Sequence, residues 1–220
     1  MLLVHGLAAS AATTWREAGW LDLLADADRP VLAPDLPGHG GNRLPPPPAE
    51  VDLVGYLLDL LPPEPVHAIG FSLGASTILR AAMRSPERFE RIVLTGVGES
   101  LFRDDEALSG IADALEAGDA DDPIARYFLE HARRSGADPL DLARVIRRQR
   151  DPLAPDDLAK VAMPVLVVIG DRDFAGPGEP LADALPDGRC TTLRGVDHFG
   201  TPKDFGCLDA ALDFLGALPA

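Results

Sequence analysis

Cysteine is scarce in this chain of 220 residues, which contains only Cys190 and Cys207. Two cysteines cannot form a disulfide framework, and neither belongs to a CxxC pair or to a histidine cluster with metal-ligand spacing. We therefore expect both to be small core side chains, and we expect neither a metal nor another cofactor. A chain of this length can bury a hydrophobic core without such cross-links.

Basic residues are also few, with 20 Lys and Arg against 35 Asp and Glu, and the formal net charge is −15. This charge repels a phosphate backbone, and no compact Lys/Arg block offsets it, which argues against nucleic-acid binding. No apolar run approaches the roughly 18 residues of a membrane span, and no basic residues precede the short apolar start as they would in a signal peptide. We predict a cytoplasmic protein without a membrane partner, while its oligomeric state stays open.

Short apolar runs alternate with longer amphipathic ones, a βαβα pattern typical of a mostly parallel sheet with helices on both faces. The runs are rich in Val, Leu and Ile without polar alternation, as in strands that are buried on both sides. We expect an α/β fold with about six strands, at residues 2–5, 30–33, 66–70, 91–95, 165–170 and 189–193. The clearest helices are expected at residues 15–27, 51–61, 73–83 and 208–215.

The segment 100–157 interrupts this pattern because it contains no convincing strand and several glycines and prolines. We expect it to be a small helical cap inserted between two parts of one α/β core, residues 1–99 and 158–220. An insertion after the strand at 91–95 emerges at the edge of the sheet where ligands bind, so the cap should cover a pocket.

The sequence Gly70-Phe71-Ser72-Leu73-Gly74 directly follows an expected strand and begins an expected helix. Glycines on both sides permit a turn so tight that Ser72 projects from the end of the strand. The N-terminal end of the helix then directs free N–H groups at charge developing near the hydroxyl. This arrangement favours a nucleophilic serine.

A serine nucleophile needs a base and a group that orients the base. Asp171 and Asp173 follow the strand at 165–170, and Asp197-His198 follows the strand at 189–193, so all lie at the same sheet edge as Ser72. The order Ser, Asp, His is that of the α/β-hydrolases. Asp173 is favoured as the acid over Asp171, which remains an alternative. The other four histidines are weaker candidates for the base.

Five motifs in the same order as in the family make the sequence resemble the α/β-hydrolase fold over nearly its whole length. They are the serine motif, Val4-His5-Gly6-Leu7, Asp35-Leu36-Pro37-Gly38-His39-Gly40, Gly170-Asp171-Arg172-Asp173 and Asp197-His198. Relatives usually carry two further strands before the His-Gly strand, so either the sheet is shortened at this edge or the chain does not begin at its natural start.

The resemblance implies roles for five residues. Ser72 would be the nucleophile, His198 the general base and then acid, and Asp173 the partner that orients the imidazole. The backbone N–H groups of Leu7 and Leu73 would form the oxyanion hole. The family implies a serine hydrolase that cleaves an ester or related acyl bond of a small substrate, most closely a carboxylesterase.

Other activities use the same residues in this family. Carbon–carbon bond hydrolysis, thioester cleavage and lactone opening stay open as alternatives. From a different class of function, so does a receptor that keeps the pocket and binds a small ligand without catalysis. The sequence does not identify the physiological substrate.

The pocket itself is less clearly marked in the sequence. Phe71 and Phe199 flank the motif residues and should provide apolar walls. Arg144, Arg147 and Arg148 have i, i+3 and i+4 spacing, which places them on one face of a cap helix. They could be a solvated surface, or one of them could face the pocket and bind a substrate carboxylate.

Overall fold

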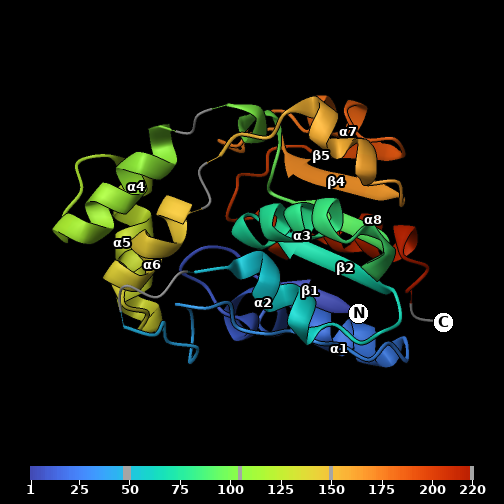
Figure 1. Ribbon diagram of the computed structural model, residues 1–220, viewed down its shortest axis with the longest axis horizontal. Coiled ribbons are helices and arrows are strands. Elements are labelled where there is room, and N and C mark those ends of the chain that lie inside the picture. Colours follow the sequence, from blue (N-terminus) through green and yellow to red (C-terminus); the bar gives the residue numbers. More distant parts are fainter. Residues whose placement is uncertain (47–50, 104–105, 149–150, 219–220) are drawn as a thin grey trace.

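The core of the protein is a five-stranded parallel sheet. The computed structural model describes residues 1–46, 51–103, 106–148 and 151–218. Neighbouring strands pair in parallel and in chain order, so each connection crosses over one face of the sheet. The strands are β1 (Leu2–Val4), β2 (Val66–Phe71), β3 (Phe89–Thr95), β4 (Val165–Gly170) and β5 (Gly188–Leu193). Figure 1 shows them in this order across the molecule.

The expected sixth strand, 30–33, is wrong. The segment forms only an isolated parallel bridge with β1 through Leu32. The Leu32 N–H donates to the Met1 carbonyl at 2.8 Å, and the Leu32 carbonyl accepts from the Leu3 N–H at 2.9 Å. A proline begins the segment and another follows it directly. Because proline has no N–H, the ladder cannot continue in either direction.

Helices cover both faces of the sheet (Figure 1). On one side α2 (Leu53–Leu60), α3 (Leu73–Arg84) and α7 (Glu179–Asp183) share a buried cluster with residues such as Leu2 and Ile92. On the other side the helices share a second cluster with residues such as Leu3 and Val93. These are the π-helix η1 (Ala12–Arg16), α1 (Trp20–Asp26) and α8 (Phe205–Phe214). Alternate strand residues thus enter opposite cores, which confirms that the sheet is buried on both faces.

Three helix boundaries differ from expectation for local reasons. The helix expected at 15–27 is broken at Gly19, whose φ of 82° lies in the left-handed region that ends a right-handed helix. α2 begins at Leu53 because the Asp52 side chain caps it by accepting the Gly55 N–H at 2.8 Å. α8 begins three residues before its expected start, after a similar cap by Asp204.

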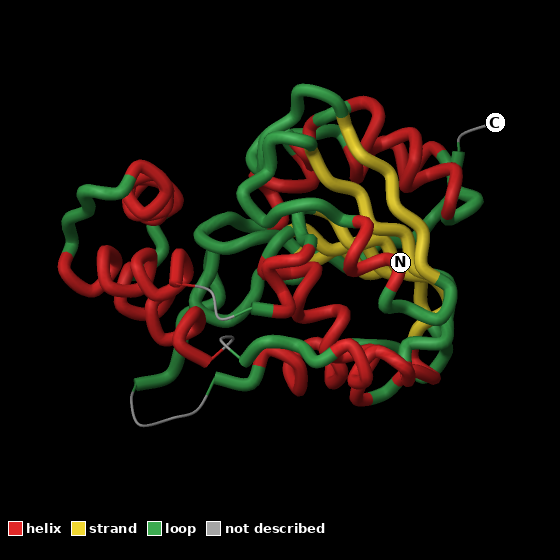
Figure 2. Tube along the Cα trace, turned by 90° about the horizontal axis from the view of Figure 1, so that it is seen from above, coloured by secondary structure: helices red, strands yellow, loops and turns green. Residues whose placement is uncertain are grey.

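Three further helices lie between β3 and β4 and stand to one side of the sheet (Figures 1 and 2). These cap helices are α4 (Glu106–Ala117), α5 (Pro123–Ser135) and α6 (Pro139–Arg148). They share a buried cluster with Leu7 and Ala8, which follow β1, so they cover the edge at which the strands end. Assignment of residues 100–157 as a separate cap unit stays a prediction.

Short 3₁₀ helices complete the described chain: η2 (Pro86–Arg88), η3 (Glu99–Phe102), η4 (Pro155–Lys160) and η5 (Thr201–Lys203). None of the helices in the described ranges combines the length and apolarity that crossing a membrane requires.

Candidate active site

Ser72 occupies a strained turn between β2 and α3. Its φ of 52° and ψ of −113° lie in a region that a residue with a side chain rarely adopts. The Ser72 N–H donates to the Thr95 carbonyl at 2.9 Å, which ties the turn to β3. Such strain persists only where the surrounding structure enforces it, and it is typical of functional sites. The turn projects the hydroxyl beyond the end of the sheet.

The two flanking glycines are required by close backbone approaches. A Cβ atom at Gly70 would lie 2.6 Å from the Ala75 Cα, and one at Gly74 would lie 2.2 Å from the Val4 carbonyl oxygen. Real Cβ atoms do not approach backbone this closely. The spacing of the motif therefore follows from how tightly α3 packs against β1 and β2.

A chain of hydrogen bonds links three side chains at this edge. The Ser72 Oγ lies 3.0 Å from the His198 Nε2, and the His198 Nδ1 lies 2.9 Å and 3.0 Å from the two carboxylate oxygens of Asp173. His198 and Asp173 are 3% and 8% exposed. The three residues follow β2, β5 and β4, so the parallel sheet brings together groups that are 126 and 25 positions apart in the sequence.

The neighbouring aspartates have different partners. The Asp173 Oδ1 also accepts the Ala175 N–H at 2.9 Å, which fixes the carboxylate. Asp171 accepts the Gly195 N–H at 2.7 Å and joins the loop after β4 to the loop after β5. Asp197 accepts the Gly200 N–H at 2.8 Å. The geometry therefore pairs His198 with Asp173 rather than with Asp171 or Asp197.

Two backbone N–H groups adjoin Ser72. Leu73 is the first residue of α3, where an N–H has no partner within the helix and lies at the positive end of the helix dipole. Leu7 lies in the loop after β1. Both residues line the same cavity as Ser72 and His198, so their N–H groups remain the candidate donors of an oxyanion hole.

Ser72 and His198 lie at the junction of two cavities, which they line together with Leu7 and Phe128. The first cavity has a volume of about 90 Å³ and a mainly apolar lining from α3, α4, α6 and the loops after β3 and β4. Among its described lining residues, His198 is the only titratable one. We call it the uncharged cavity.

The second cavity, of about 140 Å³, is lined by charged and polar side chains as well as apolar ones. We call it the polar cavity. Glu17 and Lys203 are exposed residues at this cavity, and Thr13 and His131 also line it. Burial, Arg134 and Lys203 lower the pKa of His131 below its usual value, so the neutral imidazole is favoured there.

Aromatic residues concentrate around His198. The chain has only eight Phe, two Trp and two Tyr, yet five of them line the two cavities: Phe71, Tyr127, Phe128, Phe174 and Phe199. The ring centroids of Phe174 and Phe71 lie 4.2 Å and 5.0 Å from that of His198. Of the five, Phe71 and Phe199 are evident from the sequence as neighbours of the motifs, and both line the polar cavity.

The structure does not bring the three cap arginines into either cavity. Arg147 donates to Asp113 at 2.6 Å and to Glu116 at 2.7 Å and 2.9 Å on the outside of α4. Arg144 donates to the Pro45 carbonyl at 3.2 Å, and Arg148 is exposed. The hydrophobic residues of α6 face the sheet and the other cap helices, so its charged face turns away.

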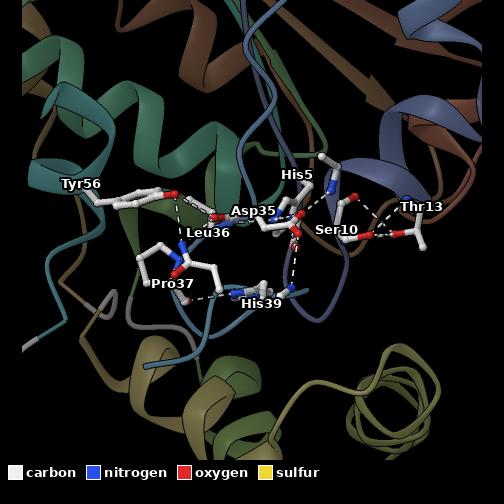
Figure 3. A network of polar contacts seen from close by, with 12 residues as sticks. His5, Ser10, Thr13, Asp35, Leu36, Pro37, His39 and Tyr56 are labelled. Carbon is white, nitrogen blue, oxygen red and sulfur yellow. Dashed lines mark hydrogen bonds and ion pairs between the residues drawn. The ribbon is translucent and has the colours of Figure 1, made fainter. Parts of the chain in front are cut away.

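A buried polar network supports the loop that carries Leu7 (Figure 3). The His5 Nε2 accepts the Leu36 N–H at 3.0 Å, so the Nδ1 carries the proton and donates to the Gly6 carbonyl at 2.8 Å. The Asp35 carboxylate accepts the Ala11 N–H at 2.8 Å. Burial lowers the pKa of His5, which keeps it neutral.

His39 lies beside His5 in this network, with ring centroids 5.1 Å apart. Its Nδ1 donates to the Pro37 carbonyl at 3.1 Å. Burial and the neighbouring His5 lower the pKa of His39 to about 3. Tyr56 donates to the Asp35 carbonyl at 3.0 Å. The network joins the Leu7 loop to the turn at 35–42, but neither histidine reaches Ser72.

The residues that the sequence did not reveal come mainly from the cap and from α3. Phe128 reaches the junction of the cavities from α5, which no sequence motif marks. Ser76 lies one helical turn after Ser72, a spacing that could have placed it on the same face of α3. Phe174 directly follows Asp173 and covers His198, and only its adjacency to the motif could have signalled it. Within the described ranges, no three His, Cys, Asp or Glu residues could hold a metal ion together.

Residues 1–140 match the protein family described as the alpha/beta hydrolase fold. The chain belongs to the alpha/beta hydrolase fold family. Solved structures agree with this assignment. A hydrolase from Pseudomonas aeruginosa is 25% identical with a TM-score of 0.70, covering 98% of this chain and 90% of its own. A thermophilic esterase from Thermogutta terrifontis shares the fold with a TM-score of 0.76 at 21% identity, covering 100% of this chain and 90% of its own.

Two relatives of this member of the alpha/beta hydrolase fold family carry the names of hydrolases. A pimeloyl-[acyl-carrier protein] methyl ester esterase from Neisseria meningitidis serogroup A is 28% identical over 200 residues, which cover 77% of this chain and 62% of the relative. A 2-hydroxymuconate semialdehyde hydrolase from Pseudomonas is 31% identical over 121 residues, which cover 50% of this chain and 41% of that enzyme. The similarity thus spans less than two thirds of either relative.

Proposed function

We propose that this protein is a serine hydrolase that cleaves an ester or related acyl bond of a small substrate. The observation that carries the proposal is the continuous hydrogen-bonded chain from the Ser72 Oγ through His198 to Asp173. The esterase among the relatives supports the reaction class. The small cavities on both sides of Ser72 favour a substrate of modest size.

In the first half of the reaction, His198 accepts the Ser72 proton at Nε2 while the Oγ attacks the carbonyl carbon. Asp173 holds the proton on Nδ1 and stabilises the imidazolium. The carbonyl oxygen becomes an oxyanion, which the N–H groups of Leu7 and Leu73 stabilise. The bond to the leaving alcohol then breaks, His198 returns the proton to that alcohol, and the acyl group stays on Ser72.

In the second half, His198 removes a proton from water, and the resulting hydroxide oxygen attacks the acyl-enzyme. Collapse of the second oxyanion breaks the bond to Ser72, which recovers its proton from His198. The products are a carboxylic acid and an alcohol. No cofactor takes part in these steps.

The test combines turnover with labelling of the serine. The purified protein should hydrolyse para-nitrophenyl acetate or butyrate, and a fluorophosphonate probe should label it. Ser72→Ala should lose both properties with an unchanged melting temperature. Ser85→Ala is a matched control, because Ser85 follows the opposite end of the same helix. Turnover that survives Ser72→Ala would contradict the mechanism, and a folded protein that is neither active nor labelled would favour a ligand-binding role.

A second candidate reaction is hydrolysis of a carbon–carbon bond. The specific observation that favours it is the 31% identity to a 2-hydroxymuconate semialdehyde hydrolase. Incubation with 2-hydroxymuconate semialdehyde, followed by loss of its visible absorbance, would detect this activity. Turnover of this compound at a higher kcat/KM than of any ester would replace the ester assignment.

A further inference from the structure

Ser76 is a buried polar residue in the wall of the uncharged cavity. It lies on α3 four residues after Ser72, and both residues line this cavity. The residue is 9% exposed and lines the cavity beside Leu73 and Val97. Throughout the chain that the structure describes, the Ser76 Oγ has no hydrogen-bond partner.

Most buried hydroxyl groups in this protein have partners within the fold. Thr77 donates to the Leu73 carbonyl at 2.7 Å, Thr95 to Gly70 at 2.9 Å and Thr201 to Asp197 at 3.0 Å. The exceptions in the described ranges are Ser76 and Thr14, and each lines one of the cavities that meet at Ser72. The hydroxyls that the fold leaves without a partner are thus those that a substrate can reach.

We propose that Ser76 is a substrate-binding residue that selects acyl groups carrying a neutral oxygen, such as an ether, hydroxyl or ketone. This inference rests on the proposed esterase activity. When a substrate fills the uncharged cavity and displaces solvent, a Ser76 hydroxyl facing only hydrocarbon loses its hydrogen bonds, whereas a neutral oxygen in the acyl chain restores one. Sites built around a buried polar group reject analogues that leave it unpaired.

The charge of the cavity decides whether the substrate oxygen bound by Ser76 is neutral or ionised. Its described lining contains neither Lys nor Arg, and apart from the hydroxyls of Ser72, Ser76 and Ser100 and the imidazole of His198, the lining side chains are aliphatic or aromatic. A carboxylate placed there would lose its hydration without gaining a counter-ion, which is far more costly than burial of a neutral oxygen. Ser76 can therefore bind an uncharged oxygen but cannot compensate for a charged one.

The arrangement of the two cavities decides which part of the substrate meets Ser76. The leaving group must face the side chain that protonates it, and the polar cavity is formed by His198 together with Phe199, Pro202 and Lys203 from the same loop. His198 also borders the uncharged cavity, but only that cavity is lined by the first turn of α3, through Leu73 and Ser76, on the side of the proposed oxyanion donor Leu73. The acyl group accordingly occupies the uncharged cavity, and the alcohol occupies the polar one.

Isosteric esters test the proposal. Para-nitrophenyl methoxyacetate differs from the butyrate by one oxygen in place of a methylene group, and the 3-methoxypropanoate differs from the pentanoate in the same way. For each pair, the ratio of kcat/KM for the ether ester to kcat/KM for the hydrocarbon ester is measured in the wild type and in Ser76→Ala. Intrinsic differences in ester reactivity cancel when the ratios of the two proteins are compared.

In Ser76→Ala, this ratio should fall about three- to tenfold for at least one pair, as expected for loss of one neutral hydrogen bond. The hydrocarbon ester serves as the internal reference for each protein, so the ratio and not the absolute rate tests the role of Ser76. Ser85→Ala, the same substitution at the far end of α3, should leave both ratios unchanged.

The outcomes separate this proposal from the proposed function. Hydrolysis that depends on Ser72, with unchanged ratios in Ser76→Ala, would overturn the role of Ser76 alone. A wild type that hydrolyses none of the four esters would overturn both. An equal fall in the ratios of Ser76→Ala and Ser85→Ala would also overturn the role of Ser76, because the effect would then not depend on the cavity.

Discussion

Two Asp–His pairs lie near the same edge of the sheet, and they differ in what surrounds the imidazole. In the first pair, His198 uses one nitrogen for Asp173 and directs the other at the Ser72 hydroxyl beside two cavities. In the second, the Nε2 of His5 already accepts a backbone N–H and lies 3.8 Å from Asp35, with no exposed surface. The same residue types therefore form a proposed proton relay in one place and a structural brace in the other.

The difference shows that an acid and a histidine do not by themselves make a base. A general base needs a free lone pair, a hydroxyl within hydrogen-bond distance and access for substrate. His198 has all three. His5 is neutral and fully engaged, so we expect it to act only on stability and on the position of the Leu7 loop.

Replacement of the two histidines should give the largest difference in activity between the two Asp–His pairs. His198→Gln removes the proposed base, and kcat should fall by about 10⁶-fold, since loss of the histidine of such a triad costs nearly as much as loss of the whole triad. His5→Gln keeps a polar group beneath the loop, so the folded molecules of this variant should retain most of their kcat. Steady-state kinetics on para-nitrophenyl butyrate measures kcat of both variants, and circular dichroism is the folding control. Similar losses in both variants would refute the distinction.

Replacement of the two aspartates should distinguish the two pairs in the same way, with a smaller loss of activity. Asp173→Asn leaves the shape of the site but favours the wrong imidazole tautomer, and kcat should fall by about 10⁴-fold with little change in stability. In the native protein, the two oxygens of Asp35 accept the N–H groups of Ala11 and Gly41. In Asp35→Asn, one of these oxygens becomes an NH₂ group, which cannot accept a hydrogen bond, so one of the two bonds is lost. The free energy of unfolding should fall by about 1–3 kcal/mol.

Urea denaturation and steady-state kinetics on both aspartate variants measure the two effects. Loss of activity without loss of stability in Asp35→Asn would place that residue in the proposed mechanism instead of the structural network.

The pH dependence of stability should identify the structural network. His39 has a pKa of about 3 in the folded protein and about 6.5 in the unfolded chain. Between these values the unfolded chain binds a proton that the folded protein does not, so stability is full above pH 6.5 and falls as the pH is lowered. The slope contributed by His39 is at most about 1.4 kcal/mol per pH unit.

Urea denaturation at pH values from 7 to 4 tests this assignment. His39→Gln should reduce the slope of the free energy of unfolding against pH by up to the contribution of one proton. His131→Gln should reduce this slope less, because His131 is only half-buried. A wild-type dependence that persists in His39→Gln would contradict the burial of a neutral His39.

The smallest effect is expected at the cap arginines, which carry charge but lie outside both pairs and both cavities. Arg147→Ala should leave the ratio of kcat/KM for monomethyl adipate to that for methyl hexanoate unchanged, because the guanidinium contacts Asp113 and Glu116 on the surface. Its effect on stability should be about 1 kcal/mol or less. A selective loss of activity on the carboxylate substrate would show that an arginine reaches the site in solution.

Much of the candidate site could be predicted because it depends on local backbone geometry. The glycines around Ser72 report how closely α3 approaches β1, and the aspartate and histidine loops follow strands that the hydrophobic pattern predicts correctly. The strand at 30–33 was overpredicted for a related reason. Its apolar residues resemble a strand, but the neighbouring prolines limit its pairing to one bridge.

The sequence by itself determined the parallel α/β core, the order of the motif residues and the tight turn at Ser72, because these follow from hydrophobic pattern and from steric limits along the chain. Only the tertiary structure decided that Asp173 and not Asp171 meets His198, that the cap arginines face away, and that Ser76 and Phe128 line the cavities. These outcomes depend on how separate helices and loops pack against one another, and spacing along the sequence does not encode that directly.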